Sequence, residues 1–169
     1  MSFKESYRTV LTQVHPDNQL GSNSIVLLDE ICQKIIHVMT VNAKEVMIKD
    51  HKRRILKDHI RQSISNILID ELQKHALIEG EKGMRNVSQF IFPINKTARY
   101  MRIVFNIDED SVKYMSYVIE YLFAEIIELS GSVCKDMIKI RISPDHIKLA
   151  INNDTELYDL VIDKCKMKL

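Results

Sequence analysis

Two long stretches of this chain place an apolar residue at every third or fourth position, the spacing that lines one face of an α-helix. The first begins just after Asn23 and Ser24 and the second at Ser111, and all three are good helix-capping residues. The apolar positions are Ile25, Leu28, Cys32, Ile35, Met39, Ala43 and Val46 in the first stretch, and Val112, Met115, Ile119, Leu122, Ile126, Leu129 and Val133 in the second. The sequence therefore predicts two amphipathic helices, each roughly twice the average helix length.

Shorter elements are predicted on both sides of each long helix. The expected short helices span 5–14 and 58–66 in the first half, and 95–104 and the segment from 144 onward in the second. Pro16 and Gly21 prevent the first helix from continuing, while Ser143 and Pro144 are suited to the cap and first turn of the last one. The segment MIKIRI, residues 137–142, is short and β-prone. The order short, long, short occurs twice, which indicates an internal repeat.

A long helix flanked by two short ones cannot close a hydrophobic core by itself. Two copies that cross at their long helices complete each other, with the loop before one long helix meeting the loop after the other. A content of only four glycines and three prolines also favours helices over sheets. We therefore expect an all-α protein with two tandem units, residues 1–84 and 92–169, joined by a linker at 85–91.

Charge and cysteine content restrict the class of protein. The formal net charge of +1 excludes a whole-chain polycation, so any nucleic-acid contact must come from local basic clusters. Cys32, Cys134 and Cys165 are odd in number and far apart, which predicts buried thiols rather than disulfides or a metal site. No apolar run approaches the roughly 20 residues that span a bilayer, and the chain does not start with a secretory signal. We expect a protein of the cytosolic or nuclear side with no membrane partner.

Motifs for catalysis and cofactor binding are absent from the sequence. No HExxH, CxxC, GxSxG or glycine-rich phosphate loop occurs, and the six histidines are scattered. His15, next to a proline, is expected in a turn or cap, and His75 and His146 are expected to be packed. The sequence therefore predicts a non-enzyme without metal or cofactor.

Several strings of residues resemble histones. KESY at residues 4–7, QVHPD at 13–17 and ELQKHALIEGEKG at 71–83 resemble histone 2B. FPINKTARYMR at 92–102, the following run through Gly131, RISPDHIKLAINND at 141–154 and the adjoining TEL resemble histone 2A. This order in one chain is similar to the viral histone doublets of large amoeba-infecting DNA viruses of the Marseillevirus type, in a reduced form. The resemblance implies two tandem histone folds, 2B-like and then 2A-like, forming an intramolecular handshake.

The same resemblance implies a function. Such a doublet is expected to form nucleosome-like particles with a histone 3 and histone 4 type partner and to package viral DNA, in the virion, the viral factory or the host nucleus. Two alternatives stay open: a histone-fold interaction or regulatory module, and a specialised doublet that does not form complete particles. Lys49 stands where the family usually has a tyrosine that packs against histone 4, and the loop FNIDEDS at 105–111 is acidic where the family is basic. The chain also lacks a basic amino-terminal tail and a carboxy-terminal docking extension, which favours the alternatives.

Three glutamates interrupt the apolar pattern of the second long helix. Glu120, Glu125 and Glu128 share one arc of about 140° on an α-helix. The resemblance adds Glu71, Glu79, Asp154 and Glu156 and implies an acidic patch that binds arginine side chains of partner proteins. The alternative is an ordinary solvated surface.

Basic residues cluster after the long helices and on the opening helix of the second unit. The candidate DNA-binding residues are Lys52, Arg53 and Arg54 in the first unit, and Lys96, Arg99, Arg102, Lys139 and Arg141 in the second. The two loop clusters occupy equivalent positions in the two units, and Lys96, Arg99 and Arg102 recur at a spacing of three on one helix face. By resemblance, Arg141 is expected to enter the minor groove of double-stranded DNA. For KRR alone, a solvated loop remains the alternative.

Overall fold

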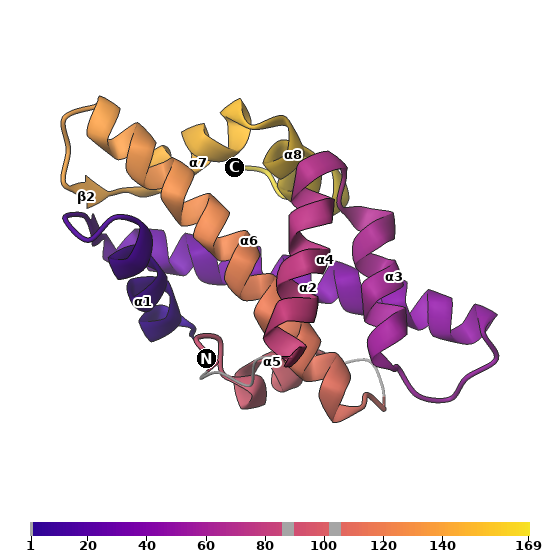
Figure 1. The fold of residues 1–169 in the computed structure, drawn as a ribbon. Helices are drawn as coiled ribbons and strands as arrows, with labels where there is room; N and C mark the ends of the chain where they lie inside the picture. The colour runs from indigo at the N-terminus through magenta and orange to yellow at the C-terminus, as the bar shows by residue number, and fades with distance from the viewer. Residues whose placement is uncertain (1, 86–89, 102–105) are drawn as a thin grey trace.

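The structure, a computed structural model, describes residues 2–85, 90–101 and 106–169. Within these ranges the chain is helical apart from its loops and two strands of two residues each (Figure 1). The first half contains α1 Lys4–Val14, β1 Gln19–Leu20, α2 Ser22–Lys49, α3 Lys57–Ile67 and α4 Asp70–Arg85. The second half contains α5 Ile94–Met101, α6 Glu109–Asp136, β2 Arg141–Ile142, α7 Pro144–Asn153, α8 Thr155–Tyr158 and the π-helical segment η1 Asp159–Lys164. The expected all-α class and the two long helices with short helices on both sides are confirmed, whereas α4, α8 and η1 were not predicted. The helix expected at 95–104 is described only as far as residue 101, so its last residues lie outside the described ranges. None of the described helices could cross a lipid bilayer.

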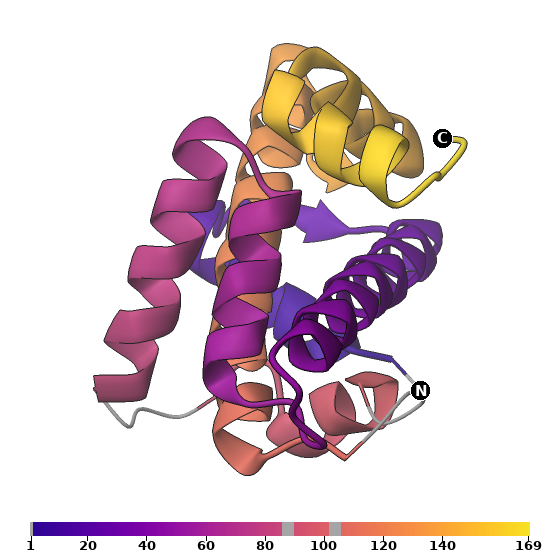
Figure 2. The same ribbon diagram turned by 90° about the vertical axis from the view of Figure 1, so that its right-hand side faces the viewer.

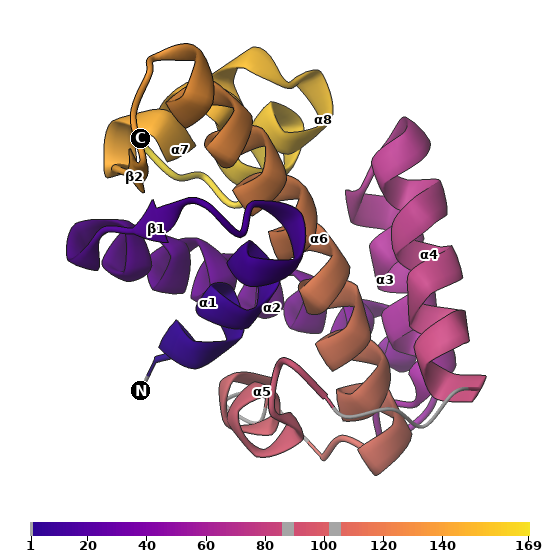
Figure 3. The ribbon, with the colours of Figure 1, turned by 60° about the vertical axis from the view of Figure 1, so that its left-hand side comes forward.

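The two long helices α2 and α6 cross, and the short helices of each half pack on the long helix of the other half. Helices α1, α3 and α4 contact α6, while α5, α7 and η1 contact α2. Figure 3 shows α6 running between α1 on one side and the α3–α4 pair on the other, and Figure 2 shows the C-terminal segment beside α2. One hydrophobic core contains side chains from both long helices, including Leu28, Ile35, Met39, Ile119, Leu122 and Ile126. Neither half buries its apolar stripe alone, as the sequence predicts.

The backbone of the second half repeats that of the first with an offset of 87 residues. Helix α2 begins at Ser22 and α6 at Glu109, 87 positions later, and both contain 28 residues. In the turn after each long helix one residue adopts the left-handed conformation, His51 with φ of 54° and Ile138 with φ of 56°. These two positions also differ by 87. The predicted internal repeat is therefore present in the backbone geometry.

The loops around the long helices meet in pairs. Strand β1, before α2, pairs in parallel with β2, after α6, and places Gln19 opposite Arg141. In the other pair of loops, a single parallel bridge joins Ile55, after α2, to Ile107, before α6. We call these places the β1–β2 end and the Ile55–Ile107 end. Each joins the loop before one long helix to the loop after the other, as expected.

Both long helices begin earlier than the sequence indicated. The N-cap of α2 is Gly21 rather than Asn23 or Ser24. The N-cap of α6 is Asp108, whose Oδ1 accepts a hydrogen bond from the backbone N–H of Ser111 at 2.7 Å. The aspartate satisfies one of the free N–H groups of the first helical turn, so the helix starts there.

The two serines expected as caps instead bond to the opposite loops. The hydroxyl of Ser24 donates to the carbonyl of Ile142 at 2.7 Å, and the hydroxyl of Ser111 donates to the carbonyl of Ile55 at 3.3 Å. Both serines are fully buried. They are equivalent residues of the two halves, so a serine hydroxyl donates a hydrogen bond across each paired-loop end.

The helices that follow the loops also start alike. The backbone N–H of Leu56 donates to Nδ1 of His59, and that of Ser143 donates to Nδ1 of His146, both at 3.0 Å. Both histidines are buried. The expected start of α7, with Ser143 as cap, and the packing of His146 are confirmed.

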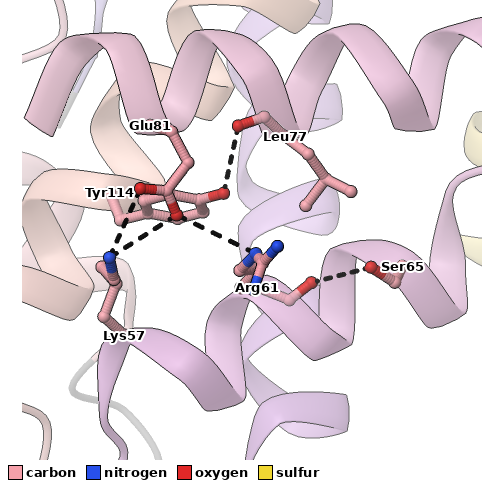
Figure 4. A network of polar contacts seen from close by, with 6 residues as sticks. All are labelled: Lys57, Arg61, Ser65, Leu77, Glu81 and Tyr114. Atoms are coloured by element: carbon pink, nitrogen blue, oxygen red, sulfur yellow. Dashed lines mark hydrogen bonds and ion pairs between the residues drawn. The ribbon is translucent and has the colours of Figure 1, made fainter.

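Helices α3, α4 and α6 are joined by a polar network (Figure 4). The carboxylate of Glu81 lies 3.4 Å from Nζ of Lys57 and 3.9 Å from Nε of Arg61. The hydroxyl of Tyr114 donates to the carbonyl of Leu77 at 3.4 Å, and burial raises the pKa of Tyr114 to about 12. The phenol therefore stays protonated and able to donate, which links α6 to α4.

An aromatic cluster joins the N-terminal residues to the second half. The ring centroids of Phe3 and Phe92 are 5.1 Å apart, and those of Tyr7 and Phe123 are 5.2 Å apart. All four side chains are buried, and the hydroxyl of Tyr7 donates to Oδ1 of Asp29 at 3.0 Å. Offset aromatic pairs add to the free energy gained by burial alone. The start of the chain is thereby fixed against α6.

His15 forms a further contact between the halves. It is the C-cap of α1, as expected for a turn or cap residue, and its Nε2 lies 2.8 Å from the carbonyl oxygen of Glu128 in α6. Because a carbonyl only accepts, Nε2 carries the proton. A Cβ atom added at Gly131 would overlap the ring of His15. Glycine at this position therefore permits the close approach of the α1–β1 loop to α6.

All three cysteines are buried and unbridged, as predicted. Burial raises the pKa of Cys165 to about 12 and also raises the pKa of Cys32 and Cys134. Because the thiolate is the reactive form, these side chains behave as small apolar groups.

Candidate functional sites: an acidic surface and paired basic loops

Six of the seven expected carboxylates line two adjoining hollows. Four of them, Glu71, Glu125, Asp154 and Glu156, surround a hollow of about 240 Å³ between α4, α6 and the start of α8. Glu79 and Glu120 line a second hollow of about 390 Å³. The ring of Tyr121 borders both hollows. We call Glu71, Glu79, Glu120, Glu125, Glu128, Asp154 and Glu156 the acidic surface. Glu128, which is exposed like Glu71, lines neither hollow.

Two members of the acidic surface also stabilise helix starts. The carboxylate of Glu156 accepts a hydrogen bond from the backbone N–H of Leu72 in the first turn of α4. Oδ1 of Asp154, the N-cap of α8, accepts one from the backbone N–H of Leu157 at 2.8 Å. A negative charge is favourable at both places because the N-terminus of a helix is partially positive. Glu156 thereby ties the second half to the first.

Basic side chains of α4 pair with part of the acidic surface. Glu71 pairs with Lys74 and His75, each at 3.2 Å, and Glu79 pairs with Lys82. Exposed pairs of this kind contribute little free energy and exchange readily with water. The expectation that His75 is packed is wrong: it is exposed, because it lies on the same face of α4 as Glu71.

The carboxylates of α6 lie close enough to other acids to repel them. Burial, together with the charges of Glu128 and Asp154, raises the pKa of Glu125. Burial and the charge of Glu79 raise the pKa of Glu120. Burial also raises the pKa of Tyr121, and the charges of Glu125, Glu156 and Glu79 add to the effect. The acidic residues predicted from the sequence therefore converge in space and share one electrostatic environment.

The loop cations lie exposed at the two paired-loop ends. Lys52, Arg53 and Arg54 occupy the turn between α2 and α3 at the Ile55–Ile107 end. Lys139 and Arg141 lie between α6 and α7 at the β1–β2 end, and both are exposed. The offset of 87 residues makes Lys52 equivalent to Lys139 and Arg54 equivalent to Arg141. Each of these arginines directly precedes the buried isoleucine that bonds across to the other half.

The basic row expected on α5 is only partly formed in the described residues. Lys96 is half-buried, and its Nζ donates to the carbonyl of Ser2 at 2.8 Å and lies 5.9 Å from the centre of the Phe3 ring. Arg99 is exposed on α5, and Arg102 lies outside the described residues. Lys96 thus faces the N-terminal segment, because the aromatic cluster brings that segment against α5.

Acidic residues lie next to the cations of the Ile55–Ile107 end. The backbone N–H of Asp108 donates to the carbonyl of Ile55 at 3.1 Å. Glu109 and Asp110 follow it in the exposed first turn of α6 and pair with Lys113 at 2.8 and 3.7 Å. The expected acidic loop is therefore part of this end, and it lowers the positive potential there.

Known histones match parts of this chain. The chain is 43% identical over 75 residues to a histone 2A of Volvox carteri, 42% identical over 73 residues to a histone 2A of Chlamydomonas reinhardtii, and 38% identical over 88 residues to a macro-type histone 2A of Capsaspora owczarzaki. These matches cover 43%, 41% and 50% of this chain, and 58%, 57% and 24% of the respective relatives. The chain thus spans less than two thirds of the length of these relatives. No family model matches the chain.

One solved structure matches the chain over almost its entire length. The crystal structure of the histone from Methanopyrus kandleri superposes with a TM-score of 0.68 at 12% identity and covers 99% of this chain and 100% of that one. The chain has the histone fold. Because the elements of the first half recur 87 residues later and each half packs on the long helix of the other, the histone fold occurs twice, and the two copies form a handshake within one polypeptide.

The histone fold agrees with the prediction of a non-enzyme, since histones are structural proteins. In the part of the chain that the structure describes, no group of three or more histidine, cysteine or acidic side chains is placed to hold a metal ion.

Tyr121 is a member of the site that was not predicted from the sequence. Tyr121 precedes Glu125 by four positions and Glu128 by seven, which places all three on one helical face. That spacing could have identified it beside the glutamates. An aromatic ring between carboxylates offers a flat apolar contact for the side chain of an arginine.

Proposed function

We propose that this histone-fold chain is a structural DNA-binding protein, a fused histone 2B–histone 2A doublet that holds duplex DNA without reading its sequence. The proposal depends mainly on one observation, the equivalent placement of Lys52 with Lys139 and of Arg54 with Arg141 at the two paired-loop ends. A cation repeated at both ends of a crossed-helix pair can contact the backbone of one duplex at two points.

Binding would come from phosphate contacts and from bending of the duplex. Lysines and arginines neutralise phosphates and release condensed counterions, and an arginine can enter a narrowed minor groove. Bending the duplex between the two ends costs a few kcal/mol, which several such contacts offset. Because the net charge is only +1, this affinity would come from the local cations of the loops. It would fall steeply with salt, because each phosphate contact releases counterions.

The acidic surface would serve a different class of partner. Its carboxylates suit the capture of arginine side chains by charge-assisted hydrogen bonds. The exposed pairs of Glu71 with Lys74 and of Glu79 with Lys82 are weak enough to be replaced by a partner's guanidinium. The matching chemistry is a protein segment with exposed arginines.

The order of the 2B-like and 2A-like segments supports a viral doublet. We propose that it assembles with a histone 3 and histone 4 type partner into nucleosome-like particles that package viral DNA, in the virion, the viral factory or the host nucleus. Reconstitution with the partner histones, followed by nuclease digestion, tests this assembly. A protected DNA fragment of defined length supports packaging, and uniform digestion contradicts it.

The DNA-binding role itself is tested by salt dependence. We expect affinity for a random duplex to fall linearly on a log–log plot between low and physiological salt, with a slope of about −0.9 for each phosphate contact. Two double-stranded DNAs of unrelated sequence but matched base-step flexibility should give the same curve. A flat response to salt would exclude the role.

A histone-fold interaction module is the second candidate. The acids Asp108, Glu109 and Asp110 beside the cations of the Ile55–Ile107 end favour it, because they oppose close contact with phosphates. This candidate predicts binding of arginine-rich peptides at the acidic surface together with duplex affinity no greater than that of an unrelated near-neutral protein.

A further inference from the structure

The turn after α6 exposes an apolar tip. Met137, Ile138 and Ile140 leave 49%, 93% and 67% of their surface exposed. Among the described residues, Ile138 is the most exposed large hydrophobic side chain. Single exposed apolar residues are ordinary, but three on one short turn form a small patch. We call Met137, Ile138 and Ile140 the apolar tip.

The histone-fold turn does not itself require apolar residues. The equivalent positions of the first copy, 87 residues earlier, are Asp50, His51 and Arg53, all of them polar. The backbone conformation is shared, since residues 51 and 138 both have a positive φ. The apolar character therefore belongs to the second copy alone.

Ile138 combines two unfavourable features in the folded protein. Its φ of 56° lies in the left-handed region, which histidine tolerates better than a β-branched residue does. Its side chain also lies in water. Residues held in such conformations are concentrated at sites of function, where the surrounding structure maintains the strain.

Cations flank the apolar tip along the chain. The exposed cations next to it are Lys135, Lys139 and Arg141. Asp136 is the one acid in the stretch 135–141. The tip and its cations are therefore complementary to a ligand that is a polyanion with an apolar interior. Duplex DNA has this chemistry, with phosphates on the outside and stacked bases between them.

We propose that the apolar tip is a wedge that enters the minor groove of duplex DNA and partly unstacks one base step, while Lys139 and Arg141 contact the flanking phosphates. This inference rests on the proposed DNA-binding function. The tip adjoins Arg141, which is equivalent to Arg54 at the other paired-loop end, so it lies where the duplex would pass. A protruding turn of three side chains suits insertion between bases better than docking of a protein helix, which needs a groove.

The test compares Ile138→Asn with His51→Asn in the full-length protein. Asparagine tolerates a positive φ, so Ile138→Asn should raise Tm by about 2–4 °C as the strain is relieved. The same substitution should weaken binding of a random duplex about tenfold, since an apolar contact is lost. The salt slope should not change, because no ionic contact is removed. His51→Asn, at the equivalent turn, should leave affinity within twofold of the original.

DNA bending gives an independent readout. Fluorescence energy transfer between the ends of a short duplex should report a smaller bend with Ile138→Asn and with Ile140→Thr, which keeps the side chain β-branched. The original protein should prefer a duplex with a central TA step over one with a stiff A-tract, and both variants should lose that preference.

The possible failures can be told apart. A steep salt slope in the original protein, with unchanged affinity and bending in Ile138→Asn, overturns the wedge but leaves the proposed function intact. Absence of any duplex binding by the original protein overturns both. Loss of binding to phosphatidylserine vesicles in Ile138→Asn, with DNA binding unchanged, would assign the tip to a lipid surface and overturn the wedge. An equal loss of DNA affinity in His51→Asn would also overturn it.

Discussion

Among the described residues, the β1–β2 end of the handshake is fastened by more contacts than the Ile55–Ile107 end, although both belong to the same repeat. At the β1–β2 end, the backbone N–H of Gln19 and the side-chain amide of Asn18 both donate to the carbonyl of Ile140, at 3.0 and 3.1 Å. The packing of His15 against Gly131 adds a side-chain contact close to this end.

The Ile55–Ile107 end has fewer such contacts in the described residues. The backbone N–H of Ile55 donates to the carbonyl of Asn106 at 3.0 Å, and that of Asp108 donates back to Ile55. Asn106 and Asp108 flank the single bridge residue Ile107. In the described ranges, two residues of β1 pair with two of β2, and one residue pairs at the Ile55–Ile107 end.

The two ends also differ in charge, and the end with fewer bonds across it has more cations. The Ile55–Ile107 end has Lys52, Arg53 and Arg54 close to the acidic start of α6, whereas the β1–β2 end has Lys139, Arg141 and the apolar tip. The firmly fastened end thus has fewer cations and presents apolar side chains. The same repeated backbone therefore presents two chemically different surfaces.

Removal of the loop cations should have the largest effect on DNA affinity and should show how much each end contributes to binding. On the proposed function, changing Lys52, Arg53 and Arg54 to glutamine should make the salt slope shallower by about 2.7, and changing Lys139 and Arg141 by about 1.8. Affinity should fall by roughly 100-fold or more in the triple variant at low salt. Titration of a labelled duplex at four salt concentrations measures both slopes. Equal slopes for all three proteins would show that these side chains do not contact phosphates.

Gly131→Ala should lower the free energy of unfolding by about 1–3 kcal/mol, because the new methyl group overlaps His15 and the ring must move. Gly21→Ala is the matched control at the same end, since its Cβ would lie 3.2 Å from the carbonyl oxygen of Ile142 and needs only a small shift. Urea denaturation followed by circular dichroism measures both. Equal stabilities for the two variants would show that His15 does not anchor this end.

The paired serines allow a direct comparison of the two ends. Ser24→Ala removes a hydrogen bond of 2.7 Å and Ser111→Ala one of 3.3 Å, both to carbonyls that keep a backbone donor. We expect losses of about 1.5 kcal/mol and about 0.5 kcal/mol in the free energy of unfolding. A larger loss for Ser111→Ala would reverse the order of the two ends.

The two long helices also differ at equivalent positions, since α2 has Val38 and Val41 where α6 has Glu125 and Glu128. Burial and neighbouring acids raise the pKa of Glu125, so the folded protein binds a proton more tightly than the unfolded chain does. Stability should therefore fall as pH rises from the ordinary glutamate pKa through the raised value.

Glu125→Gln should flatten this pH dependence and give a small rise in Tm at pH 7, the smallest of the effects considered. Thermal unfolding between pH 4 and pH 7.5 measures it, with Glu30→Gln on the exposed face of α2 as the matched control. A pH profile that is the same in Glu125→Gln and in the original protein would mean that α6 does not concentrate negative charge.

The sequence predicted the core of this fold because burial leaves a local periodic pattern. Patterns among neighbours within four positions predicted the apolar stripes of α2 and α6. They also predicted the helix start at Ser143 and the β-prone residues before it. The convergence of the acidic surface was predicted through the resemblance, since Glu71 and Glu156 are too far apart in the chain for spacing to join them.

What the sequence did not predict depends on contacts between the halves. Ser24 and Ser111 have the chemistry of caps, but their hydroxyls bond to the opposite loops. Lys96 is on the predicted helix face, yet the N-terminal segment accepts its hydrogen bond. The positive φ of Ile138 is set by the turn geometry rather than by residue type. Such features follow from long-range packing, which no local pattern encodes.

Fragment complementation tests the shared core most directly. Residues 1–85 and 90–169 would be produced separately and followed by circular dichroism during heating, alone and mixed in equal amounts. Because each apolar stripe is covered by the other half, each fragment alone should lack a cooperative transition, and the mixture should regain one together with its helical signal. Cooperative unfolding of each fragment by itself, unchanged on mixing, would contradict the account.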